Sequence, residues 1–281
     1  MNQKWIKFKI NQTFDQKTVR VFLEHFFIAH KKIYKLEMDH AILVNKKEVK
    51  THELLHQGDE IEFDLSQLSA DKVMPYKGDI EVVYEDEDFL VLNKPRACLV
   101  YSDGTDLDTL TNRVAYHYHT FYPILPIHRI DYDTTGLVLF AKHGLSLAYV
   151  SKLFEEDQIE KTYDCVVEND FIDKKGVIKT KIARDRHDQK MRVSDSGKDA
   201  FTSYEVVGYL EQYPRLKVMI KGGRKHQIRV HLRSIGHPII SDLLYGHKNL
   251  KYPNLMLHFS KIKFIHPRAL EYVEIVKEAD F

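Results

Sequence analysis

The feature that most constrains this chain is a polar loop that runs directly into a buried strand near the middle of the sequence. The apolar run 137–141 is short, rich in strand-forming residues and preceded by Gly136, so it predicts a core strand rather than a helix. Asp131 precedes that strand and is therefore held by a rigid element, where catalytic groups tend to lie. Taken alone, an Asp in such a loop is more often a residue that hydrogen-bonds its own turn.

Strands outnumber helices after residue 79, and connections of hairpin length predominate. Helices are predicted through 107–118, 147–154 and 225–235, where apolar residues recur at steps of three and four. The fold class predicted is α+β, with a mixed, largely antiparallel sheet flanked by helices and a small α/β domain ahead of it. Strands are predicted at 79–84, 89–95, 137–141, 161–167, 176–183, 201–208 and 215–220.

The first part of the chain predicts a separate small module. Helical spacing at 18–27 and 34–40 is followed by two short strands around a polar turn at 41–49, and by a turn and strand at 58–63. This order resembles the alpha-L RNA-binding domain, although a module used only for packing is the alternative. We therefore expect an RNA-binding domain at 1–68, a polar linker at 69–78 and a catalytic domain at 79–281.

Charge is distributed unevenly along the sequence. Residues 174–233 contain 16 Lys and Arg against 6 Asp and Glu, whereas the remaining residues contain 26 and 35, so the net charge of +1 conceals a basic segment. Such a segment suggests a directed surface for a polyanion, unless its charges are spread over all faces of a sheet.

Other sequence features concern the compartment and the classes of chemistry. We expect a cytoplasmic protein, because no run approaches the roughly 20 apolar residues of a membrane helix and the first residues lack a secretory signal. Cys98 and Cys165 suggest neither a disulfide framework nor a zinc site. The 16 His show no tight ligand pattern, so we expect no metal.

We expect three segments to converge: the Asp131 loop, the strand 161–163 and the segment 222–232. The last of these predicts an anion site. A Gly-Gly turn leads into a helix that starts with Arg224 and Lys225, where backbone N–H groups and the helix dipole add to the side-chain charge. His226, Arg229 and Arg233 fall on one stripe of that helix, beside its apolar stripe. The stripe fits a phosphate backbone, and it equally fits a solvated helix face.

Together these segments resemble the RluA-type pseudouridine synthase family over about residues 79–281. The resemblance rests on His128-Arg129-Ile130-Asp131 with Thr134 and Gly136, and on the segment 223–232. It departs from the usual family pattern at Gly222, Lys225 and Ser241, which bears on the grip on RNA. Further matching motifs, in family order, are Asn93-Lys94-Pro95, Lys161-Thr162-Tyr163, Gly236-His237-Pro238-Ile239, Asp242 with Tyr245-Gly246, Leu257-His258 and His266-Pro267.

The resemblance implies isomerisation of uridine in RNA to pseudouridine without a cofactor. Asp131 matches the essential aspartate, and Arg229 matches its cationic partner. Tyr163 matches the aromatic ring that holds the flipped uracil, and it is also a candidate for removing the C5 proton. Arg129 matches the residue that fills the space left by the flipped base. The resemblance implies RNA contacts by His128, Arg129, Thr134, Arg224, Lys225, His226 and Gln227.

The expected partner is a stem-loop of ribosomal or transfer RNA, and we expect a monomer. Unpaired or weakly paired uridines cost less to flip than uridines in a stable helix. Two alternatives remain open at this point: an RNA-binding or assembly factor that kept the fold without catalysis, and an RNA glycosidase that stops after bond cleavage.

Overall fold

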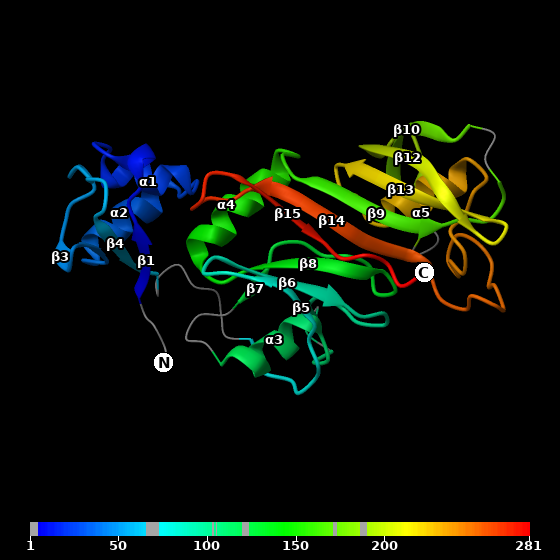
Figure 1. The fold of residues 1–281 in the computed structure, drawn as a ribbon, viewed down its shortest axis with the longest axis horizontal. Coiled ribbons are helices and arrows are strands. Elements are labelled where there is room, and N and C mark those ends of the chain that lie inside the picture. The colour runs from blue at the N-terminus through cyan, green and yellow to red at the C-terminus, as the bar shows by residue number, and fades with distance from the viewer. Residues whose placement is uncertain are drawn as a thin grey trace.

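A large twisted sheet runs through most of the molecule, and a small sheet with two helices lies at one end of it, next to α4 (Figure 1). The computed structural model describes residues 5–65, 73–102, 104, 106–119, 124–170, 173–185 and 190–281. Part of the predicted linker, residues 69–72, lies outside the described residues, while 73–78 form no helix or strand. The domain bounds 1–68 and 79–281 stay a proposal.

The N-terminal module is built on a four-stranded sheet of order β1-β4-β2-β3. The Thr18 hydroxyl caps the first helix by accepting a hydrogen bond from the Val21 N–H. The first strand was not predicted from the sequence, and the second helix starts earlier than expected. The elements are β1 (Trp5–Lys9), a 3-10 turn (Gln12–Phe14), α1 (Val19–His25), α2 (His30–Met38), β2 (Ile42–Val44), β3 (Lys47–Glu48) and β4 (Glu60–Asp64).

The large sheet has eleven strands, in the order β11-β10-β12-β13-β9-β14-β8-β6-β5, with β15 on β14 and β7 on β8. Among the described strands, β14 and β8 form the one parallel pair, so the predicted mixed, largely antiparallel sheet is confirmed. The strands are β5 (Val82–Glu85), β6 (Phe89–Lys94), β7 (Leu125–Pro126), β8 (Thr135–Ala141), β9 (Glu160–Val166), β10 (Lys175–Arg184), β11 (Met191–Val193), β12 (Lys198–Leu210), β13 (Tyr213–Lys221), β14 (Leu257–Ile265) and β15 (Tyr272–Val276).

Three helices flank this sheet: α3 (Leu110–Tyr118), α4 (Gly144–Glu155) and α5 (Gln227–Ser234). The third starts two residues later than predicted because His226 adopts a left-handed backbone, with φ 56°, and precedes the first helical turn. None of the described helices is long and apolar enough to cross a membrane.

The junction between β8 and β14 accepts no side chain at Gly136. This residue has φ +109°, and a Cβ placed on it would lie 2.4 Å from the Phe259 carbonyl oxygen. The close approach brings the loop before β8 directly against β14. It explains why glycine stands at the start of the strand that was predicted from the run 137–141.

The basic segment 174–233 is divided between two faces of the sheet. Thr202 and Ile220 pair across β12 and β13, and the Thr202 hydroxyl accepts a hydrogen bond from Gln227, so this face packs against α5. Side chains alternate along a strand, which places Lys217 on the opposite face. The other lysines at such positions of these strands lie on that same face, away from α5, so the segment 174–233 as a whole does not form one basic surface. These strand lysines are Lys175, Lys179, Lys181, Lys217 and Lys221.

Candidate active site

A cleft of about 1130 Å³ opens between the loop that precedes β8, helix α4, strand β9 and the start of α5. It brings together residues from three segments that are far apart in the sequence, as was predicted. Lys225 is exposed and does not line the cleft. The other predicted site residues line it: His128, Arg129, Asp131, Thr134, Tyr163, Arg224, His226, Gln227 and Arg229.

The charged centre of the cleft is the pair formed by Asp131 and Arg229. Arg229 Nη1 lies 3.3 Å from Asp131 Oδ2, and the Asp131 side chain remains 22% exposed. The turn bond at this position is made by the Asp131 backbone carbonyl, which accepts from the Thr134 N–H, while the carboxylate contacts Arg229. The Asp131 carboxylate therefore lies beside a cation and still faces the cleft.

A second carboxylate, Asp242, holds the guanidinium of Arg229 in place. Asp242 is buried, and its two oxygens accept hydrogen bonds of 2.8 Å from Arg229 Nε and Nη2. Burial acts to lower the pKa of Arg229, but hydrogen bonds and charge from Asp242, with the charge of Asp131, outweigh it and raise that pKa. Since this bidentate pair fixes the guanidinium plane, Nη1 points at Asp131. Sequence reasoning gave Asp242 no role.

His226 and Tyr245 complete the polar wall next to Asp131. His226 Nε2 lies 3.8 Å from Asp131 Oδ1, and His226 Nδ1 is 2.8 Å from the Tyr245 hydroxyl. The ring of Tyr245 lies under the Arg229 guanidinium, 5.2 Å from it. Burial lowers the pKa of His226, which outweighs the opposing charge of Asp131. The histidine is therefore mostly neutral near pH 7.

Tyr163 supplies an aromatic surface on the strand side of the cleft. Its ring is stacked on Phe259, with centroids 4.5 Å apart and planes 11° apart, so its orientation is fixed. Burial and the charge of Asp131 raise the pKa of the Tyr163 phenol. The phenol therefore stays protonated at neutral pH, which makes it a poor proton acceptor.

Two further polar residues line the cleft. Thr134 is buried, and its hydroxyl has no hydrogen-bond partner among the described residues. Arg129 is exposed, and its guanidinium lies 5.1 Å from the Tyr101 ring centroid. Tyr101 also lines the cleft and was not predicted from the sequence.

Gln227 and His128 line the cleft, but their polar groups form hydrogen bonds within the protein. The Gln227 amide donates to the carbonyls of Phe201 and Lys221, and its oxygen accepts from the Arg224 N–H. His128 Nε2 accepts a hydrogen bond from the Leu139 N–H. Burial, with the charge of Lys161, lowers the pKa of His128 to about 3. Both side chains shape the cleft wall.

Comparisons with known proteins agree with this geometry. A family model described as RNA pseudouridylate synthase matches residues 88–234, and the RluD ribosomal pseudouridine synthase N-terminal domain matches residues 6–61. YhcT of Bacillus subtilis strain 168, described as an uncharacterized RNA pseudouridine synthase, is 34% identical over 291 residues, covering 100% of this chain and 96% of the relative.

A second relative and a solved structure also match proteins named as pseudouridine or pseudouridylate synthases. Ribosomal large subunit pseudouridine synthase D of Yersinia pestis is 30% identical over 247 residues, 85% of this chain and 74% of the relative. The structure of human RNA pseudouridylate synthase domain containing 1 matches with a TM-score of 0.61 at 23% identity, covering 76% of this chain and 87% of that chain, which speaks to the fold alone.

The chain belongs to the RNA pseudouridine synthases of the RluA and RluD type. It is accordingly an isomerase that converts uridine in RNA to pseudouridine. The resemblance stated from the sequence motifs and the predicted enzyme class are both confirmed.

Proposed function

We propose that this enzyme modifies uridine in large-subunit ribosomal RNA, with Asp131 as the group that acts on the sugar–base unit. The observation that carries the proposal is the partly exposed Asp131 carboxylate in the cleft, opposed by a guanidinium that a second, buried carboxylate holds in position. The choice of ribosomal RNA follows the relatives named as ribosomal large subunit synthases.

In the proposed reaction, Asp131 assists cleavage of the bond between uracil N1 and ribose C1′. The uracil then turns within the cleft, C5 joins C1′, the C5 proton leaves, and N1 regains a proton. The product is an isomer of the substrate, so no co-reactant is consumed. Arg229 places a positive charge beside this carboxylate, and an adjacent cation offsets part of the cost of displacing water.

The remaining residues bind the extruded nucleotide. Tyr163 presents its ring to the flipped uracil, and stacking of a base on an aromatic ring contributes about 1–3 kcal/mol. Arg129 stacks in the space that the base vacates. A protonated Tyr163 phenol argues against its additional use as the base that removes the C5 proton.

The test measures tritium release from RNA labelled at uridine C5. Wild-type enzyme is expected to release tritium from an unmodified large-subunit ribosomal RNA transcript, and Asp131→Asn to be at least about a thousandfold slower. Asp133→Asn is the matched control, because it makes the same charge change in the same loop at an exposed residue that does not line the cleft.

Three outcomes would overturn parts of the proposal. Equal release by wild type and Asp131→Asn would remove the role of Asp131. Release from labelled transfer RNA but not from the ribosomal transcript would overturn the choice of substrate. Free uracil among the products would indicate a glycosidase.

A further inference from the structure

Arg268, in the turn between β14 and β15, lies where the N-terminal module contacts the catalytic part of the chain. Its Nε and Nη2 bind the two oxygens of Asp88 at 2.8 and 3.1 Å. Its Nη1 donates to the Lys7 carbonyl at 2.8 Å, and its guanidinium lies 4.0 Å from the ring centroid of Phe8. One side chain therefore joins strand β1 of the module to the β5–β6 turn.

Aromatic and histidine contacts extend this joint. His25 Nε2 lies 2.9 Å from the Pro267 carbonyl oxygen, and the rings of His25 and Tyr149 are 5.3 Å apart. Phe26 and Phe27 also contact Tyr149, with ring centroids 6.1 and 5.7 Å away. The contact is thus a packed apolar surface around a charged centre, unlike a loose tether.

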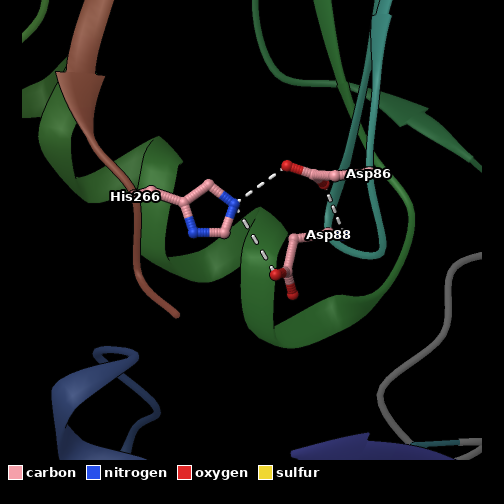
Figure 2. A group of neighbouring side chains, drawn as sticks. All are labelled: Asp86, Asp88 and His266. Carbon is pink, nitrogen blue, oxygen red and sulfur yellow. Dashed lines mark hydrogen bonds and ion pairs between the residues drawn. The ribbon is translucent and has the colours of Figure 1, made fainter. Parts of the chain in front are cut away.

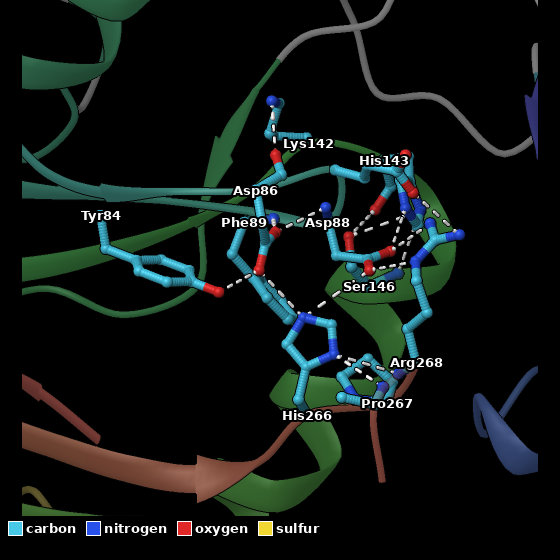
Figure 3. A network of polar contacts seen from close by, with 12 residues as sticks. Tyr84, Asp86, Asp88, Phe89, Lys142, His143, Ser146, His266, Pro267 and Arg268 are labelled. Carbon is cyan, nitrogen blue, oxygen red and sulfur yellow. Dashed lines mark hydrogen bonds and ion pairs between the residues drawn. The ribbon is translucent and has the colours of Figure 1, made fainter. Parts of the chain in front are cut away.

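The charged centre contains a triad that resembles a metal site. Asp86, Asp88 and His266 point toward one another from the β5–β6 turn and the segment after β14 (Figure 2). However, both Asp88 oxygens already bind Arg268, and Asp88 Oδ1 also contacts His143 Nε2 at 2.8 Å (Figure 3). The Asp88 side chain is only 1% exposed. Both oxygens of Asp88 are therefore already used by groups of the protein, so we interpret the cluster as a structural joint.

Helix α4 connects this joint to the active site. Tyr149 lies on its side that faces the module, while Leu147, Ser151 and Phe154 of the same helix line the catalytic cleft. His143, which contacts Asp88, caps the start of α4 by accepting a hydrogen bond from the Ser146 N–H. The module and the cleft therefore share one rigid element as a wall.

We propose that Arg268 is a positioning residue that fixes the N-terminal module relative to the catalytic cleft, so that an RNA spanning both surfaces meets a preformed site. This inference rests on the proposed action on ribosomal RNA. Rigid preorganisation lowers the conformational cost of binding a large RNA, because the two surfaces need not be ordered on binding. A short stem-loop that contacts only the cleft gains nothing from it.

The first experiment measures the geometry of the joint. Spin labels attached to Lys32→Cys on α2 and Val177→Cys on β10 report the distance between the two parts, since both positions are exposed and both native cysteines are buried. Arg268→Gln is expected to broaden the distance distribution. Phe8→Leu, which removes the ring beneath the guanidinium without stranding a charge, is expected to broaden it less.

The second experiment separates KM from kcat in tritium release. For Arg268→Gln we expect KM for the ribosomal RNA transcript to rise about tenfold, with kcat unchanged and with unchanged kinetics on a short stem-loop cut from that transcript. Lys263→Ala is the matched control: it lies on β14 and removes an ion pair with Glu160 and a ring contact with Tyr272, all within the catalytic part.

An unchanged distance distribution in both joint variants, or an unchanged KM for the transcript, would overturn the proposal. A fall in kcat on the stem-loop would also overturn it, because it would show damage to the active site itself. If wild type releases no tritium from any RNA, the proposed function fails, whereas the distance measurement still decides whether the joint is rigid.

Discussion

Two arginine–aspartate clusters in this molecule use the same chemical groups for different ends. In the cleft, Arg229 binds Asp242 through two hydrogen bonds and reaches Asp131 through one longer contact, which leaves Asp131 partly exposed. In the joint, Arg268 binds both oxygens of Asp88, and that carboxylate is almost completely buried.

The difference teaches that a carboxylate's unused acceptor positions, rather than its arginine partner, mark it as available to a substrate. Asp88 accepts hydrogen bonds from Arg268 and contacts His143, so no oxygen remains free for a ligand. Asp131 faces the cleft with capacity to spare. By the same reasoning, Asp242 positions Arg229 and does not itself contact the substrate. Four predictions test this comparison, from the largest expected effect to the smallest.

Replacing Asp242 with asparagine should damage both activity and stability. Asn cannot accept the bidentate pair as a carboxylate does, so Arg229 loses its fixed plane and its aim at Asp131. We expect tritium release to fall about a hundredfold, and the free energy of unfolding in urea to fall by about 3 kcal/mol. Full activity in Asp242→Asn would contradict the assigned positioning of Arg229.

Replacing Asp88 with asparagine should cost stability alone. It removes one partner of a buried pair, and the free energy of unfolding should fall by about 3 kcal/mol. Folded Asp88→Asn should retain wild-type kinetics on a short stem-loop. The companion variant Asp131→Asn should change stability by less than about 1 kcal/mol, since its single, longer contact at a partly exposed carboxylate is weak. A reversed order of the two unfolding energies would break the comparison.

Replacing Tyr163 with leucine should weaken catalysis through lost stacking. Kcat/KM is expected to fall about tenfold, within the range of 1–3 kcal/mol for base–aromatic stacking. Tyr163→Phe keeps the ring and should remain close to wild type, because the buried phenol stays protonated. A large loss in Tyr163→Phe would instead show that the hydroxyl takes part in the reaction.

The histidine on the cleft wall should make stability depend on pH. Since folding lowers the pKa of His128 from 6.5 to about 3, the unfolded chain binds more protons between these values, and stability falls as the pH drops through that window. In His128→Gln the slope of unfolding free energy against pH should be smaller by up to about 1.4 kcal/mol per pH unit. Parallel curves for wild type and variant would show that residue 128 does not titrate in this way.

The sequence predicted the fold class well where strands were apolar and continuous. The run 137–141 became β8, and the strands predicted at 176–183, 201–208 and 215–220 became β10, β12 and β13. It did not predict β14, the strand that joins the two halves of the sheet, because buried polar residues interrupt its pattern. His258 is one of them, and it is satisfied by the Thr135 hydroxyl and the Lys277 carbonyl, partners that only the folded chain supplies.

The sequence predicted the main residues of the site but not the residues that hold them in position. Motif order placed Asp131, Tyr163 and Arg229 together through the family resemblance. Helical spacing alone left Arg229 open to interpretation as a solvated charge, yet it is buried against Asp242, 13 residues further on. Spacing along one helix cannot show that a loop beyond it supplies the neutralising carboxylate.

The close approach at Gly136 has a consequence for engineering. The backbone of Phe259 fills the space that any side chain at position 136 would need, so the loop bearing Asp131 and strand β14 must keep this close approach. An exchange of this loop between relatives, made to alter RNA choice, should therefore carry its partner strand along as a single cassette.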